Sequence, residues 1–162
     1  SQLNIYGKTK ADGDLAASTT AKHYIVRTSW VVGEGKNFIN TMKDLATRNI
    51  KPSVVSDQIG RLTFTDTLAC GIKHLLDANL PYGTYNITNE GPFVSWAEIA
   101  KIVFEKSGKP ASDVRSISTD EYFSNKPDSA KRPLNSTLNL TKIEKTGFTP
   151  EDWRDKLSKL FN

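Results

Sequence analysis

Tyr6 and Lys10 are the two residues whose types and spacing most directly suggest chemistry. On a helix, residues four apart share one face, with their Cβ atoms roughly 5–6 Å apart. A lysine ammonium beside a tyrosine hydroxyl favours the phenolate by charge attraction, and the positive charge of an oxidised nicotinamide would add to this effect. The pair therefore suits proton transfer to or from a carbonyl or alcohol oxygen while a cofactor carries the hydride.

The spacing alone is not specific, because Tyr122 and Lys126 repeat it. Pro127 follows this second copy, so it is not expected in a helix interior. Without further context, the alternative interpretation of the first pair is a half-buried tyrosine, Tyr6, and a solvated lysine, Lys10.

Other classes of site find little support. His23 and His74 have no Cys or His neighbour at ligand spacing, so no metal site is expected. The sequence contains no G-x-S-x-G motif of a serine hydrolase and no carboxylate pair that stands out as a glycosidase dyad. A single cysteine, Cys70, excludes an internal disulfide and is interpreted as a small buried apolar residue.

The composition limits the classes of ligand and partner that this protein is expected to bind. The 162 residues carry a net charge of +4, which suits an anionic ligand such as a nucleotide or pyrophosphate. The lysines are scattered and no nucleic-acid-binding motif appears, so nucleic acid is not expected as a partner. No apolar run approaches the ~18–20 residues of a membrane span, and the polar N-terminus does not resemble a signal peptide. We therefore expect no membrane partner and a cytoplasmic location.

Helices and strands are predicted to alternate along the chain. This order favours an α/β fold with mostly parallel strands, and without a convincing linker we expect one domain over 1–162. A capping-box pattern, Ser95 followed by Glu98, predicts the start of one helix. The predicted helices are 7–21, 37–48, 65–79, the one that follows Ser95, 141–146 and 150–161; the predicted strands are 23–32, 53–57, 84–88 and 114–118; and 123–137 is predicted to be a loop.

A glycine-rich phosphate-binding turn is absent from the sequence. A dinucleotide fold normally begins with a strand, such a turn and a helix that receives the pyrophosphate. The densest glycine cluster, Gly33 to Gly35, is followed by Lys36 and has neither this spacing nor that of a Walker loop. In a dinucleotide enzyme, the cofactor-binding half is therefore expected to lie outside these residues.

Four blocks of sequence carry a resemblance to a known family. The stretch YGKTKADGD at 6–14 resembles the YGxSKxxGE segment of extended short-chain dehydrogenases/reductases. Three further blocks resemble those of the dTDP-4-dehydrorhamnose reductases, in the family order: RTSWVVGEGKNF at 27–38, VVSDQIGRLTFTDTLA at 54–69 and RPLNSTLNLTKIEKTGF at 132–148. The resemblance implies the substrate-side, C-terminal part of a Rossmann-like reductase, with the N-terminal cofactor-binding half missing.

The resemblance also implies a reaction and a set of roles. The reaction is the NADPH- or NADH-dependent reduction of the 4-keto group of dTDP-4-dehydro-L-rhamnose to give dTDP-L-rhamnose. Tyr6 would donate the proton to the 4-oxygen, while Lys10 would favour the phenolate and bind the nicotinamide ribose. The remaining implied contacts are Thr28 and Ser29 beside the nicotinamide, Trp30 against the sugar, Asn37, Phe38, Gln58, Gly60 and Arg61 around the nucleotide sugar, and Arg132 near the diphosphate.

Several alternatives stay open at this point. Trp30 and Phe38 could be core residues, Arg61 a surface arginine, and Arg132 part of a structural loop. The same fold also serves non-catalytic modules, such as the regulatory subunit of methionine adenosyltransferase, and other nucleotide-sugar reductases or epimerases. We expect little or no activity from these 162 residues alone, because half of the cofactor site is absent. Whether the protein forms a homo-oligomer is a further open alternative.

Overall fold

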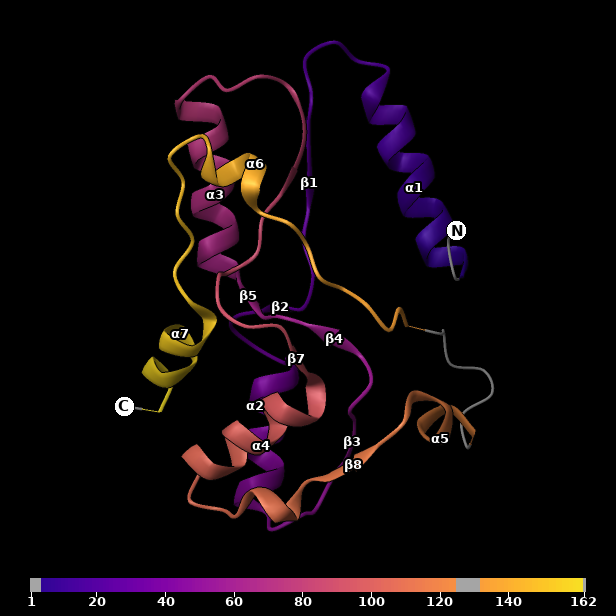
Figure 1. Ribbon diagram of the computed structural model, residues 1–162, viewed down its shortest axis with the longest axis vertical. Helices are drawn as coiled ribbons and strands as arrows, with labels where there is room; N and C mark the ends of the chain where they lie inside the picture. The colour runs from indigo at the N-terminus through magenta and orange to yellow at the C-terminus, as the bar shows by residue number, and fades with distance from the viewer. Residues whose placement is uncertain (1–3, 125–131, 162) are drawn as a thin grey trace.

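The computed structural model describes residues 4–124 and 132–161, which form an elongated α/β fold (Figure 1). Its helices are α1 (Ile5–Ser18), α2 (Phe38–Thr47), α3 (Thr65–Asp77), α4 (Trp96–Lys106), α5 (Thr119–Ser124), α6 (Thr141–Glu144) and α7 (Trp153–Lys159), with a 3₁₀ turn at Ala111–Asp113. Its strands are β1 (Tyr24–Arg27), β2 (Val31–Val32), β3 (Ser53–Val55), β4 (Ile59–Gly60), β5 (Thr63–Phe64), β6 (Gly83–Asn86), β7 (Val94–Ser95) and β8 (Arg115–Ile117).

The strands of the described chain form four short pairs. β1 pairs with β6, β2 with β5 and β3 with β8, all parallel, whereas β4 and β7 are antiparallel. In the β1–β6 pair, Tyr24 lies opposite Gly83 and Arg27 opposite Asn86. The prediction of an α/β fold with mostly parallel strands is confirmed.

Two clusters of buried apolar side chains hold the fold together. The larger lies between α2, α4, β3 and α7 and includes Ile39, Ile99, Phe104 and the fully enclosed Trp153. The smaller lies around β6, α3 and α6 and includes Tyr85. Figure 1 shows the corresponding division, with β1, α3 and α6 at one end of the molecule and α2, α4 and the β3–β8 pair at the other.

Helix α4 begins as its sequence predicted. The Ser95 hydroxyl accepts from the Glu98 backbone N–H at 3.1 Å, and the Glu98 carboxylate accepts from the Ser95 backbone N–H at 2.6 Å. This reciprocal pair satisfies two backbone donors that the first turn of a helix leaves free. It fixes the direction in which Trp96, the first residue of α4, leaves the strand β7.

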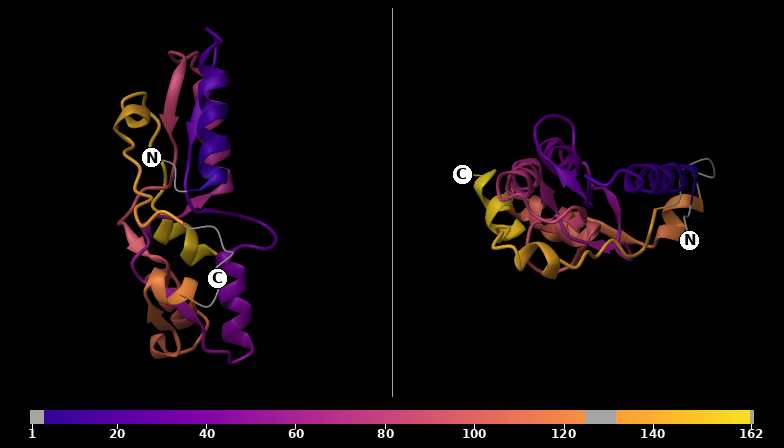
Figure 2. Two further views of the ribbon diagram at one scale, coloured as in Figure 1. Left: turned by 90° about the vertical axis from the view of Figure 1, so that its right-hand side faces the viewer. Right: turned by 90° about the horizontal axis from the view of Figure 1, so that it is seen from above.

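Helix α1 is anchored differently from the others. Asn4 caps its first turn, with a side chain that accepts from the Gly7 N–H at 2.8 Å, and the helix has no buried residue. Ile5 and Leu15 are 82% and 69% exposed. The helix runs alongside β1 in the opposite direction (Figures 1 and 2), and in the left view of Figure 2 it lies on the side of the β1–β6 pair opposite to α6. Within the described chain, no other element covers the side chains of α1 enough to bury one of them.

Several sequence predictions need correction. The strand expected over 23–32 is two strands, because Trp30 adopts a left-handed backbone conformation with φ of 50°. Helix α5 reaches Ser124, inside the stretch predicted as a loop, and Lys126 and Pro127 lie outside the described residues. Cys70 is exposed on α3, not buried. None of the helices within 4–124 and 132–161 combines the length and apolarity that a membrane crossing requires.

Candidate functional site

Tyr6 and Lys10 lie on the open face of α1. Both side chains are exposed, Tyr6 to 66%, and their helical spacing of four places them on the same face. The Tyr6 backbone oxygen accepts from the Thr9 hydroxyl at 3.0 Å, and this bond leaves the phenol hydroxyl of Tyr6 unused. The pair is therefore available to a ligand placed over α1.

The end of β1 carries two hydroxyl side chains, Thr28 and Ser29. Thr28 is exposed. The Ser29 hydroxyl is buried and has no hydrogen-bond partner among the described residues, while the Ser29 carbonyl accepts from the Thr63 hydroxyl at 2.6 Å. A buried hydroxyl without a partner is costly, so the site suits a ligand group that would bond to it.

Trp30 connects this strand end to the second half of the molecule. Its ring stacks on Trp96 with centroids 3.9 Å apart and planes 20° apart. A Cβ added at Gly60 would lie 2.7 Å from Cε2 of Trp30, so only glycine lets the indole lie against β4. The left-handed backbone of Trp30 is a costly conformation for a bulky residue, and the two contacts hold the ring in this place.

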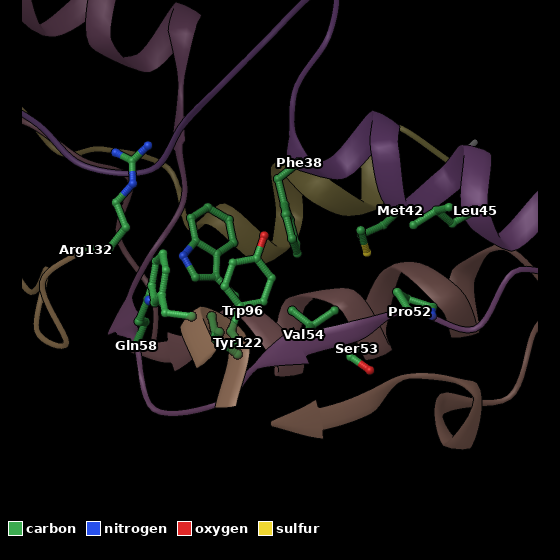
Figure 3. Close-up of a pocket in the computed structure, with 12 residues that line it drawn as sticks. Phe38, Met42, Leu45, Pro52, Ser53, Val54, Gln58, Trp96, Tyr122 and Arg132 are labelled. Carbon is green, nitrogen blue, oxygen red and sulfur yellow. The ribbon is translucent and has the colours of Figure 1, made fainter. Parts of the chain in front are cut away.

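A pocket of about 640 Å³ opens beside Trp96 (Figure 3). The Phe38 ring lies 4.4 Å from that of Trp96 and tilted by 53°, and the Tyr122 ring and the exposed Arg132 side chain complete the wall. Flat aromatic walls bind ring systems, and an arginine fork suits phosphate. The lining residues are Phe38, Met42, Leu45, Pro52, Ser53, Val54, Val55, Gln58, Trp96, Tyr122, Phe123 and Arg132.

A buried polar network supports one wall of this pocket. The Gln58 side chain donates to the Thr119 hydroxyl at 3.1 Å, and that hydroxyl donates to the Asp57 carboxylate at 2.6 Å. Burial alone would raise the pKa of Asp57, but the hydrogen bonds from the Thr119 hydroxyl and backbone N–H outweigh it and lower the pKa. The charged carboxylate thereby anchors the start of α5, which carries Tyr122.

Asn37 and Arg61, both predicted to contact substrate, have partners inside the fold. Asn37 caps α2: its side chain accepts from the Asn40 N–H at 3.0 Å and donates to the Gly33 carbonyl at 2.5 Å. Arg61 is 8% exposed, and its guanidinium donates to the Thr88 hydroxyl at 2.9 Å and to the Leu138 carbonyl at 2.9 Å. Through these bonds, both side chains stabilise the fold. Their predicted contacts with the ligand remain predictions.

Apart from Asn37 and Arg61, the structure divides the predicted residues into three groups. Tyr6, Lys10, Thr28 and Ser29 lie on α1 and at the end of the adjacent strand, and Phe38, Gln58 and Arg132 line the pocket. The third group, Trp30 and Gly60, lies between these two places. The sequence did not predict a place in the pocket for Trp96 or Tyr122. Trp96 directly follows Ser95, the residue that caps α4. An aromatic residue at the start of a predicted helix was the signal that could have pointed to the pocket.

The residues on α1 and at the end of β1 fit one end of a nicotinamide cofactor. Tyr6 and Lys10 offer a hydroxyl and an ammonium on an open face, and the buried Ser29 hydroxyl needs a partner. Nothing in the 162 residues resembles the glycine-rich turn that holds the pyrophosphate. Within the described residues, no group of three or more His, Cys, Asp or Glu side chains could hold a metal ion.

Several known proteins are similar to this chain over nearly all of its length. The chain matches the RmlD substrate binding domain family over residues 1–162. It is 41% identical over 155 residues to the spore coat polysaccharide biosynthesis protein SpsK of Bacillus subtilis, covering 94% of this chain and 52% of that protein. It is 37% identical over 171 residues to the dTDP-4-dehydrorhamnose reductase of Aggregatibacter actinomycetemcomitans, covering 98% and 56%.

Among solved structures, the fold is similar to that of the dTDP-4-dehydrorhamnose reductase of Bacillus anthracis in complex with NADP. The TM-score is 0.86 with 35% sequence identity, covering 98% of this chain and 55% of that one. The chain therefore spans about half the length of the relatives it matches.

Proposed function

Because the chain belongs to the RmlD substrate binding domain family, as its resemblance predicted, we propose that it binds the nucleotide sugar in an NAD(P)H-dependent reductase. The proposed substrate is dTDP-4-dehydro-L-rhamnose and the product dTDP-L-rhamnose. We call this chain, together with the further segment that its relatives possess, the whole reductase. The observation that carries the proposal is the Trp30–Trp96 stack, which joins the end of β1 to the aromatic pocket.

This stack gives a long ligand a continuous surface. One end of the ligand would lie over Tyr6, Lys10 and the β1 end, and the other would enter the pocket beside Trp96. A nucleotide sugar has this two-ended form, with a reacting sugar, a diphosphate and a flat base. The sugar would contact Trp30, and the base and diphosphate would contact the pocket that Phe38 and Arg132 line.

The chemistry assigned to this chain is the proton transfer. A nicotinamide cofactor, when bound, supplies the hydride that adds to the 4-carbon of the sugar. The Tyr6 hydroxyl donates its proton to the 4-oxygen, so that the carbonyl becomes an alcohol. The Lys10 ammonium stabilises the resulting phenolate by charge and hydrogen-bonds the nicotinamide ribose. Thr28 and Ser29 would lie beside the nicotinamide, and the cofactor would then give the buried Ser29 hydroxyl a partner.

Replacing Arg132 by methionine tests the pocket as the diphosphate end of the site. A charge-assisted hydrogen bond contributes about 1.5–3 kcal/mol, so dTDP should bind the whole reductase roughly 10- to 100-fold more weakly in this variant. Isothermal titration calorimetry with dTDP measures the change directly. Arg132 is exposed and its side chain makes no hydrogen bond to the described residues, so the free energy of unfolding should change by less than about 0.5 kcal/mol.

The matched control is Arg48→Met. Arg48 is also exposed, and its ion pair with Asp44 lies on α2 away from the pocket wall. This variant should bind dTDP as the unmodified protein does. Equal affinities for Arg132→Met and Arg48→Met would contradict the assignment of the diphosphate to this pocket.

A second test concerns these 162 residues alone. Their sequence contains no phosphate-binding turn for a dinucleotide, so we expect little or no turnover with NADPH or NADH as the reductant. The measurement is the change in nicotinamide absorbance with a dTDP-4-keto sugar, with the whole reductase as the positive control. Measurable turnover by the 162 residues alone would refute this expectation.

A further inference from the structure

We propose that the ion pair between Asp14 and Arg27 positions the Tyr6/Lys10 face of α1 against the end of β1. The two residues would then be positioning residues for the reduction, an inference that rests on the function proposed above. The pair joins the helix that carries the proton donor to the strand that leads into Thr28 and Ser29.

In this ion pair, the Arg27 guanidinium is oriented toward one oxygen of the Asp14 carboxylate. Nε and Nη2 of Arg27 both donate to Oδ2 of Asp14, at 3.1 and 2.8 Å. Two donors from one planar fork to one carboxylate oxygen restrict the orientation of both side chains more than a single charge contact does. The Asp14 side chain is 30% exposed and that of Arg27 57%. Partial exposure makes the pair a weak contributor to stability, so its main effect is on position.

Helix α1 has few other means of keeping its place. It has no buried residue, and its apolar side chains Ile5 and Leu15 face outward. The hydroxyls of Thr9, Ser18 and Thr19 all donate to carbonyls of the same helix. Within the described chain, the side-chain hydrogen bonds that tie α1 to another strand or helix are those between Asp14 and Arg27.

The location of the pair sets the alignment of the reacting groups. Tyr6, Lys10 and Asp14 follow one another at intervals of four, so they occupy one face, with steps of about 6 Å along the helix. Arg27 is the last residue of β1, and the chain advances about 3.3 Å per residue beyond it. Because α1 and β1 run in opposite directions (Figure 1), fixing Asp14 at Arg27 brings Lys10 level with Thr28 and Ser29.

The test compares Asp14→Asn with Asp14→Glu in the whole reductase. Asparagine keeps the size of the side chain but loses the charge that holds the Arg27 fork. We expect kcat to fall about tenfold, because a displacement on the order of 1 Å at a reacting group can cost up to about 100-fold. KM for the nucleotide sugar should stay within about twofold, since none of the residues that line the pocket around Phe38 and Arg132 belongs to α1. Glutamate restores the charge, so Asp14→Glu should recover most of kcat.

Thermal unfolding separates positioning from loss of structure. Because exposed ion pairs stabilise proteins weakly, the melting temperature of Asp14→Asn should fall by no more than roughly 2 °C. Asp44→Asn is the matched control: it breaks the exposed pair with Arg48 on α2 and should leave kcat unchanged. A kcat for Asp14→Asn equal to that of Asp44→Asn would overturn the proposal. So would a failure of Asp14→Glu to recover activity.

Tyr6→Phe, measured in the same assay, separates this inference from the proposed function. If Tyr6→Phe abolishes turnover while Asp14→Asn does not lower kcat, the proton donor stands and the positioning role is wrong. If Tyr6→Phe retains normal turnover, the proposed chemistry itself fails, and the Asp14 result then carries no catalytic meaning and the inference falls with it.

Discussion

Replacement of Tyr6 by phenylalanine should lower kcat of the whole reductase by about 10²- to 10⁴-fold, the usual contribution of a positioned general acid. Phenylalanine keeps the ring but removes the proton that the 4-oxygen must receive. KM should change little, because most of the ligand would lie along Trp30 and the pocket beyond it. Steady-state kinetics with a dTDP-4-keto sugar measure both quantities.

The control for this variant is Tyr82→Phe. Tyr82 is also exposed, to 50%, and its ring contacts Tyr24 at the far end of β1 from Thr28. Because Tyr6 is 66% exposed, neither substitution should change the free energy of unfolding by more than about 0.5 kcal/mol. Near-normal turnover by Tyr6→Phe would remove Tyr6 from the mechanism.

Replacement of Arg61 by methionine should destabilise the fold by about 3–5 kcal/mol, the range found when one partner of a buried charged network is removed. The guanidinium donates to the Thr88 hydroxyl and to the Gly91 and Leu138 carbonyls. It also lies 4.6 Å from the centre of the Phe93 ring. Burial lowers the pKa of Arg61, while the charges of Glu90, Glu144 and Asp152 oppose that shift. Methionine fills the space but leaves the hydroxyl and carbonyls without donors.

Urea-induced unfolding measures this loss, with Arg48→Met as the exposed control, which should cost about 0–1 kcal/mol. Binding of dTDP under native conditions tests the competing role, in which Arg61 contacts the diphosphate. A large loss of affinity without a loss of stability would favour that ligand contact. A loss of stability with near-normal affinity in the folded fraction would favour the structural role.

The parts of the fold that the sequence predicted well depend on local patterns. The capping box at Ser95 and Glu98 forms as expected, because both of its hydrogen bonds join residues three apart. The alternation of apolar helices and β-branched strands likewise predicted an α/β fold with mostly parallel pairing. Each of these features is decided by residues close together in the sequence.

The parts that the sequence did not predict depend on distant contacts. Nothing around Trp30 indicates a left-handed backbone, since no glycine or asparagine stands at that position. The conformation follows from the Trp96 ring and from the space left at Gly60, respectively 66 and 30 residues along the chain. Cys70 was expected to be buried because cysteine usually is, but it lies on the outer side of α3.

The candidate site shows the same contrast. Tyr6 and Lys10 were found by spacing and sequence context, and both lie on one open helix face. Tyr122 was considered only as a second copy of that spacing, yet it lies in the pocket because the Asp57–Thr119 hydrogen bonds bring α5 there. These bonds span 62 residues, beyond the reach of any local pattern.

The parallel stack of Trp30 on Trp96 has an optical consequence. Two indoles whose centroids lie 3.9 Å apart couple their electronic transitions, and such coupling produces paired bands of opposite sign in circular dichroism. The coupling falls steeply as the rings separate or rotate. The molecule thus contains an intrinsic chromophore pair at the junction between its two ends, and any ligand that shifts one ring against the other will change the spectrum without an added label.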